Sequence, residues 1–261
     1  MLSSDPEEFQ AQAVEVGRVL SAAWREYWGK GQELHSGHLA QNSLGVVAGL
    51  AVHVDKLAEQ GFNLIEQGEW LVAMPIVRSA YECAIRAQWI NQVPDGGDGF
   101  FAEDSRQVRN YAKTLSQATS ATMRDAAGKI SHRIVEEYGD PSQQARRFDL
   151  ACSDLEPGGA DAYAIYRAMS HFSHPSVLLV DQYLEDRGDS VRVRSRAESG
   201  GGSVWAGILA ASLVWATAVV EFHARDKAFR SAVRSAATEL SVEFVLKMSD
   251  DARRRNSQAK P

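Results

Sequence analysis

The sequence has 261 residues, enough for one large domain with a substantial core, and is 44% hydrophobic and 24% charged. Its formal net charge of −6 excludes a general nucleic-acid coat, because phosphate binding needs a positive field, but it allows a small basic pocket. The two cysteines, Cys83 and Cys152, form no zinc or redox motif, and residues 1–10 lack a basic and apolar leader. We therefore expect a cytoplasmic protein.

Helical periodicity, interrupted by glycine and proline, predicts a mostly helical chain. We expect helices over residues 5–28, about 38–60, 69–90, 100–123, 125–138, 161–173, 176–185, 203 to about 236, and 242–246. Glycine and proline recur between 139 and 159, which favours a connection there. Only 187–199 alternates valine with arginine at the period of a strand, which predicts a short exposed hairpin.

Three residues predict local departures from regular helix geometry. Gly45 and Gly49 each cost about 1 kcal/mol relative to alanine, and we expect them to allow close approach of a neighbouring helix. Pro75 removes a backbone donor from the apolar helix over 69–90, and we expect it to bend that helix.

These elements predict an all-α fold, a single multi-helix bundle with a short exposed β-like arm near 187–198. The helical domain is expected over 1–249, with its core at about 38–186 and C-terminal helices over 203–249. The charged residues 250–261 predict a disordered tail.

The stretch from Ser199 to Val220 carries no charge and is long enough to cross a bilayer. Many of its residues are small and partition weakly into hydrocarbon, so we interpret it as a buried helix without stable membrane insertion. A membrane-associated helical protein is the alternative.

The helix over 69–90 carries only three charges after its first residue, and they lie in one row: Arg78, Glu82 and Arg86. Apolar neighbours surround the row, and burying charges costs several kcal/mol unless they are well paired. We interpret the row as the lining of a polar cavity with surplus positive charge, suited to a small anionic ligand. The alternative is an exposed ion ladder that contributes about 0.3–0.5 kcal/mol per pair.

Polar side chains on and after the helix over 161–173 form a second group: Tyr163, Tyr166, Arg167, Ser170, His171 and His174. Steps of 4, 3 and 4 place Tyr163, Arg167, Ser170 and His174 on one stripe. His174 precedes Pro175 and is therefore expected at a helix break. A functional interpretation has Arg167 bind a phosphate or carboxylate while His174 acts as acid or base. Alternatively, His174 is a capping or core histidine and Arg167 a structural hydrogen-bond donor.

Both groups resemble the pattern of a family of uncharacterised bacterial all-helical proteins, a domain of unknown function. That pattern is an Arg-Ser-x-x-Glu helix followed later by Tyr-x-x-x-Ser-x-x-x-His-Pro-Ser. Here it corresponds to Arg78–Glu82 and Tyr166–Ser176, and the resemblance covers roughly residues 40–186. It implies a helical fold and no particular activity.

Arg167 and His174, with six residues between them, also resemble the motif of HEPN helical bundles. Many of these bundles are metal-independent RNA endonucleases of toxin and phage-defence systems. The resemblance implies a HEPN-like core with extra helices and a site at a homodimer interface. There His174 would act on the ribose 2′-hydroxyl and Arg167 would steady the phosphate, supported by Glu82, Arg78 and Tyr166.

The sequence thus leaves two functional hypotheses, neither of which needs a metal or cofactor. The first is an interaction or small-anion-sensing module built on a buried Arg/Glu/His site. The second is a HEPN-like ribonuclease acting on RNA, and both favour a homodimer. Both also require Glu82 and His174 to share one enclosed polar pocket, which is the geometric expectation that matters most.

Overall fold

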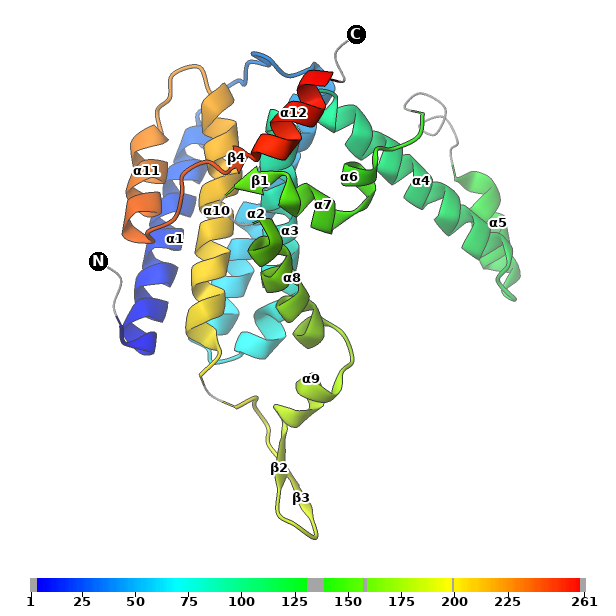
Figure 1. Ribbon diagram of the computed structural model, residues 1–261. Coiled ribbons are helices and arrows are strands. Elements are labelled where there is room, and N and C mark those ends of the chain that lie inside the picture. Colours follow the sequence, from blue (N-terminus) through cyan, green and yellow to red (C-terminus); the bar gives the residue numbers. More distant parts are fainter. Residues whose placement is uncertain (1–3, 131–138, 157–158, 199, 259–261) are drawn as a thin grey trace.

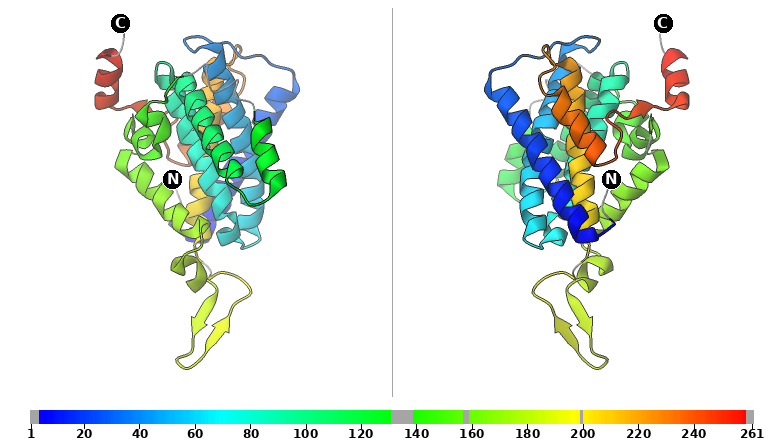
Figure 2. Two further views of the ribbon diagram at one scale, coloured as in Figure 1. Left: turned by 90° about the vertical axis from the view of Figure 1, so that its right-hand side faces the viewer. Right: turned by 90° about the vertical axis from the view of Figure 1, so that its left-hand side faces the viewer.

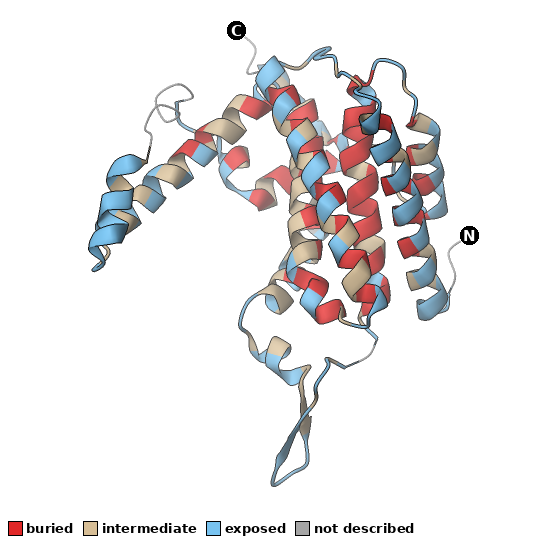
Figure 3. Ribbon diagram, turned by 180° about the vertical axis from the view of Figure 1, so that it is seen from behind, coloured by how far each residue is buried: buried red, intermediate tan, exposed pale blue. Residues whose placement is uncertain are grey.

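The computed structural model describes residues 4–130, 139–156, 159–198 and 200–258. Within these ranges almost all regular structure is helical, with only two pairs of very short strands, which confirms the predicted all-α bundle. Four long helices form its centre: α1 (Pro6–Gly29), α2 (Gln41–Glu66), α3 (Trp70–Gln92) and α10 (Gly202–His223). α10 packs against the other three, and buried residues are concentrated along these helices (Figures 1 and 3).

The first helix begins where its sequence predicts. The Asp5 carboxylate caps α1 by accepting a hydrogen bond from the backbone N–H of Glu7 at 2.8 Å. Leu20 and Trp24 lie buried on the face that meets the rest of the bundle. Local capping and amphipathic periodicity are therefore sufficient to define this element.

α10 is long and apolar enough to cross a membrane, but 72% of its apolar window is buried inside the bundle. Two of its polar side chains bond within the helix: the Ser212 and Thr217 hydroxyls donate to carbonyls one turn earlier, each at 2.7 Å. Packing between helices is thus sufficient to explain its apolar composition.

The close helix approach that we expected at Gly45 and Gly49 occurs elsewhere. A Cβ built on either residue would meet no described atom within 4 Å, so that prediction is wrong. The helix instead continues through Gly61, where an added Cβ would lie 2.5 Å from Leu209 Cδ2 of α10. The absence of a side chain at Gly61 therefore leaves room for Leu209 of α10 at this point.

The helix expected from 203 to about 236 is divided. α10 ends at His223, and α11 (Arg230–Glu239) follows after a turn. Ala224 forms an isolated antiparallel bridge with Leu34, and Lys227 adopts a φ of 54°. A contact with a distant segment therefore ends a helix that local periodicity would continue.

Two segments have a different structure from the one that the sequence predicted. The expected connection over 139–159 contains short elements: α6 (Gln143–Arg146), α7 (Phe148–Ser153) and β1 (Leu155–Glu156). The expected helix at 242–246 is instead irregular and leads into β4 (Lys247–Met248), which pairs antiparallel with β1. Elements this short derive their stability from tertiary contacts.

Two parts project from the bundle. α4 (Gly96–Ser116) and α5 (Ala121–Lys129) extend to one side, and residues 131–138 of the expected helix lie outside the described ranges. At one end, α8 (Gly159–Ser173) and α9 (Val177–Asp181) lead into the hairpin of β2 (Leu184–Asp186) and β3 (Val191–Val193) (Figure 2). The predicted arm is therefore present, beginning slightly earlier than expected.

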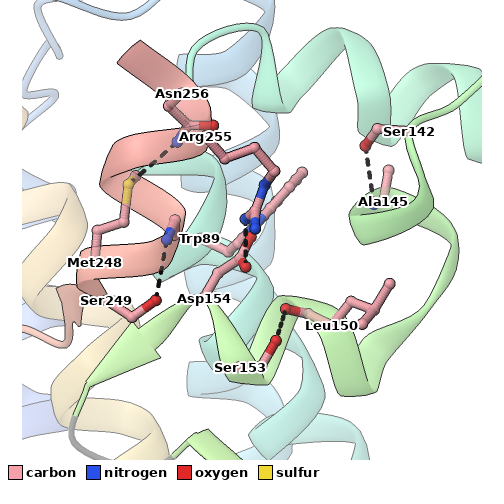
Figure 4. A network of polar contacts seen from close by, with 11 residues as sticks. Trp89, Ser142, Ala145, Leu150, Ser153, Asp154, Met248, Ser249, Arg255 and Asn256 are labelled. Atoms are coloured by element: carbon pink, nitrogen blue, oxygen red, sulfur yellow. Dashed lines mark hydrogen bonds and ion pairs between the residues drawn. The ribbon is translucent and has the colours of Figure 1, made fainter. Parts of the chain in front are cut away.

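Over residues 250–258 the structure differs from the disordered tail that we expected over 250–261, and residues 259–261 lie outside the described ranges. Residues Asp250–Gln258 form α12, and Arg255 donates to a carboxylate oxygen of Asp154 at 2.6 Å. The other oxygen of Asp154, a buried residue, accepts from Trp89 Nε1 at 3.0 Å (Figure 4). The charged side chains of α12 are therefore not all solvated, because Arg255 pairs with the buried Asp154, which is distant in the sequence.

Candidate functional site

Arg86 is more enclosed than Glu82 in the charged row on α3. Its guanidinium donates to the Ala145 carbonyl at 2.7 Å and lies 3.9 Å from a carboxylate oxygen of Glu82. Its Cζ is 5.5 Å from the centre of the Phe148 ring, and its side chain is 12% exposed. Arg86 is therefore paired and connects α3 to the α6–α7 segment.

Arg78 differs because none of its described contacts is with a carboxylate. Its Nη1 lies 3.3 Å from His174 Nε2, and its Nη2 donates to the Tyr166 hydroxyl at 2.5 Å. Its Nε is buried without a hydrogen-bond partner, and no described carboxylate forms an ion pair with this half-buried side chain. The positive charge of Arg78 is therefore uncompensated by any described acid.

The contact with Arg78 orients the His174 ring. A guanidinium N–H can only donate, so Nε2 of His174 is the acceptor when this contact is a hydrogen bond. His174 is exposed at the break before Pro175. The Ser176 hydroxyl fixes this break by accepting from the backbone N–H of Leu179 at 3.1 Å. The break that proline imposes thus positions the imidazole beside α3.

The other predicted site residues of α8 do not join this cluster. Arg167 and His171 are exposed, and their side chains form no hydrogen bond or ion pair with the described part of the chain. The Ser170 hydroxyl donates to the Tyr166 carbonyl at 2.8 Å, within its own helix. The arginine that reaches His174 is therefore Arg78, from another helix.

The single enclosed pocket that we expected for Glu82 and His174 is not formed. Glu82 lines a pocket of about 480 Å³ between α3, α4, the α6–α7 segment and α8, whereas His174 is exposed and does not line it. Tyr166 joins the two places, because its ring lines the pocket while its hydroxyl binds Arg78. The site is thus an open Arg78–Tyr166–His174 cluster beside a separate pocket.

Several residues that line this pocket were not predicted from the sequence. The Phe148 ring of α7 packs 4.5 Å from the Tyr166 ring, centre to centre, and α4 contributes Glu103 and Asp104. Phe148 lies in the segment that we predicted as a connection. The apolar residues spaced at 148, 151 and 152 were the available signal, but a helix of one or two turns is too short for periodicity to be decisive.

The described residues offer binding and proton exchange more readily than nucleophilic chemistry. Burial raises the pKa of the Cys83 thiol to about 11 and that of the Cys152 thiol to about 12, so both stay protonated at neutral pH. Within the described ranges, no group of His, Cys, Asp and Glu side chains is arranged to hold a metal ion. Arg78 supplies positive charge, and His174 supplies an exposed imidazole beside it.

Comparison with known proteins identifies a family. Residues 44–191, more than half of the chain, match the model of a family described as "Family of unknown function (DUF5677)". No curated protein and no solved structure shows a significant match. The matched range contains α3, α8 and all three residues of the Arg78–Tyr166–His174 cluster.

Proposed function

Since the chain belongs to the DUF5677 family, whose function is unknown, we propose a function from its own geometry. The protein is a helical-bundle module that binds a small anion, with Arg78 holding a carboxylate or phosphate group beside Tyr166 and His174. The observation that carries this proposal is the uncompensated charge of Arg78.

Physical chemistry supports an anion at this position. An unpaired buried donor costs about 1–3 kcal/mol, and a guanidinium has more N–H donors than the contacts to Tyr166 and His174 use. Carboxylate and phosphate match the planar arrangement of those donors and form hydrogen bonds roughly twice as strong as neutral ones. An anion would therefore satisfy both the charge and the unused donors of Arg78.

The test is a thermal-shift titration with inorganic phosphate at constant ionic strength. Wild-type protein should be stabilised in a saturable manner, and Arg78→Gln should weaken this by about tenfold or more. Arg78→Lys should also be impaired, because an ammonium keeps the charge but loses the planar array of donors. Arg167→Gln is the matched control, since Arg167 is exposed and outside the cluster. Equal responses of Arg78→Gln and Arg167→Gln would contradict the proposal.

A second candidate, metal-independent RNA cleavage, is favoured by one observation: an arginine lies 3.3 Å from an exposed histidine. In this reaction His174 would take the proton of a ribose 2′-hydroxyl, and the 2′-oxygen would bond to the adjacent phosphorus as the bond from phosphorus to the 5′-oxygen breaks. The leaving 5′-oxygen would take a proton from the imidazolium or from water, while Arg78 stabilised the phosphate charge. Purified protein should then degrade RNA in EDTA, and His174→Ala should abolish cleavage while the protein stays folded. Intact RNA after incubation with wild-type protein would reject this candidate and leave the anion-binding proposal standing.

We also propose that the protein acts in the cytoplasm as a homodimer. The unpaired thiols of Cys83 and Cys152 support a reducing compartment. Exposed apolar side chains on α9 and the arm, among them Val177 and Val193, support self-association. Sedimentation equilibrium tests the dimer, and a monomer at about 100 μM would contradict it.

A further inference from the structure

A pocket of about 520 Å³ lies between the last turns of α10, the end of α3 and the segment that contains β4 and the start of α12. We propose that this C-terminal pocket binds a small carboxylic acid with an apolar body, such as a medium-chain fatty acid. Its volume is typical of small-molecule sites. It shares no lining residue with the pocket beside Arg78, so it does not depend on the function proposed above.

The inner surface of the C-terminal pocket is apolar. Its lining includes Val219 and Phe222 of α10, together with Val245 and Met248 of the C-terminal segment. Phe222 is 54% exposed, although α10 is otherwise mostly buried. A large aromatic ring that lines a pocket on such a helix offers apolar contact area for a ligand.

The charges around the pocket select the head group. Lys247 and Arg253 line it, and no Asp or Glu is among its described lining residues. Arg253 is paired with Asp250 one turn earlier, whereas Lys247 forms no ion pair with a described residue. Glu156 lies opposite Lys247 in the β1–β4 pair but does not line the pocket, so both charged side chains of the described lining are basic although the whole chain carries a net charge of −6. This lining favours a carboxylate and disfavours an amine.

The pocket is also held in shape before any ligand binds. His38 Nε2 donates to the Asn91 carbonyl at 2.8 Å on one side. On the other side, the Asn256 side chain donates to Met248 Sδ at 3.1 Å, and Arg255 fixes α12 to Asp154 (Figure 4). A ligand that enters a preformed pocket avoids the cost of ordering these segments.

The experiment is isothermal titration of the full chain with decanoate, with decylamine as the charge-reversed probe and decanol as the neutral one. Decanoate should bind at least about tenfold more tightly than decylamine, with decanol between them. The double variant Lys247→Gln/Arg253→Gln should weaken decanoate binding by about tenfold and leave decanol unchanged. Arg254→Gln is the matched control, because Arg254 pairs with Asp251 on the same helix but does not line the pocket.

A second variant tests the apolar part of the site. Phe222→Ala should weaken decanoate and decanol alike, and its circular dichroism spectrum should match that of wild-type protein. Arg78→Gln should leave decanoate binding unchanged. A failure of the C-terminal pocket proposal can therefore be distinguished from a failure of the anion site at Arg78. The proposal is overturned if decanoate and decylamine bind equally, if the charge variant has no effect, or if neither decanoate nor benzoate binds up to about 1 mM.

Discussion

Replacing Arg255 with methionine should destabilise the protein by about 1.5–3 kcal/mol and release α12 from the bundle. In the native fold Arg255 donates to Asp154 at 2.6 Å, and the Asp154 side chain is only 5% exposed. Breaking a buried ion pair costs about 3–5 kcal/mol. Arg255 is 45% exposed, however, so solvent screens the pair, and the range for a charge-assisted hydrogen bond is appropriate.

Urea unfolding followed by circular dichroism measures the loss, and amide hydrogen exchange over 250–258 shows whether α12 is released. Arg254→Met is the matched control, because the Arg254–Asp251 pair is exposed and should contribute less than about 0.5 kcal/mol. In a double-mutant cycle with Asp154→Asn, the two losses should be less than additive by about 1–2 kcal/mol. Equal losses in Arg255→Met and Arg254→Met would refute the reasoning.

Three further predictions concern the bundle. Burial lowers the pKa of His223, so on lowering the pH the unfolded chain binds a proton at this residue before the folded protein does. The free energy of unfolding should therefore fall as the pH drops below about 6.5, by at most about 1.4 kcal/mol per pH unit. The urea midpoints of wild type and His223→Gln should converge toward about pH 5.5. Cys83 and Cys152 have raised pKa values, so native protein should react with iodoacetamide at about pH 8 at least about tenfold more slowly than urea-unfolded protein. Gly61→Ala should destabilise by about 1–3 kcal/mol through overpacking, whereas Gly45→Ala, with open space around it, should stabilise by up to about 1 kcal/mol.

Features that arise within one or two helical turns could be predicted from the sequence. The Asp5 cap, the apolar face of α1 and the strand-like arm all follow from residues close to one another in the chain. The end of α10 could not be predicted, because it depends on the bridge between Ala224 and Leu34. α12 was missed for the same reason: its anchor, Asp154, lies 101 positions before Arg255.

In the candidate site, too, local features could be predicted from the sequence, but a contact between distant residues could not. Helical spacing predicted that Arg167 and His174 lie on one face, but this holds only if both residues belong to the same uninterrupted helix. α8 ends at Ser173, and His174, before Pro175, contacts α3 while Arg167 stays exposed. The contact between Arg78 and His174 spans 96 positions, and only the packing of α8 on α3 creates it.

His174 thus contacts Arg78 and not Arg167, and these two arginines differ in burial. An exposed arginine such as Arg167 costs nothing to solvate and needs no partner. Arg78 is half-buried with a buried unpaired Nε, so the fold carries a desolvation cost that its contacts with Tyr166 and His174 only partly offset. The same guanidinium connects α3 to Tyr166 and His174. An anion that completes its hydrogen bonds would therefore strengthen the junction of the two helices, which makes ligand binding and local stability a single linked property.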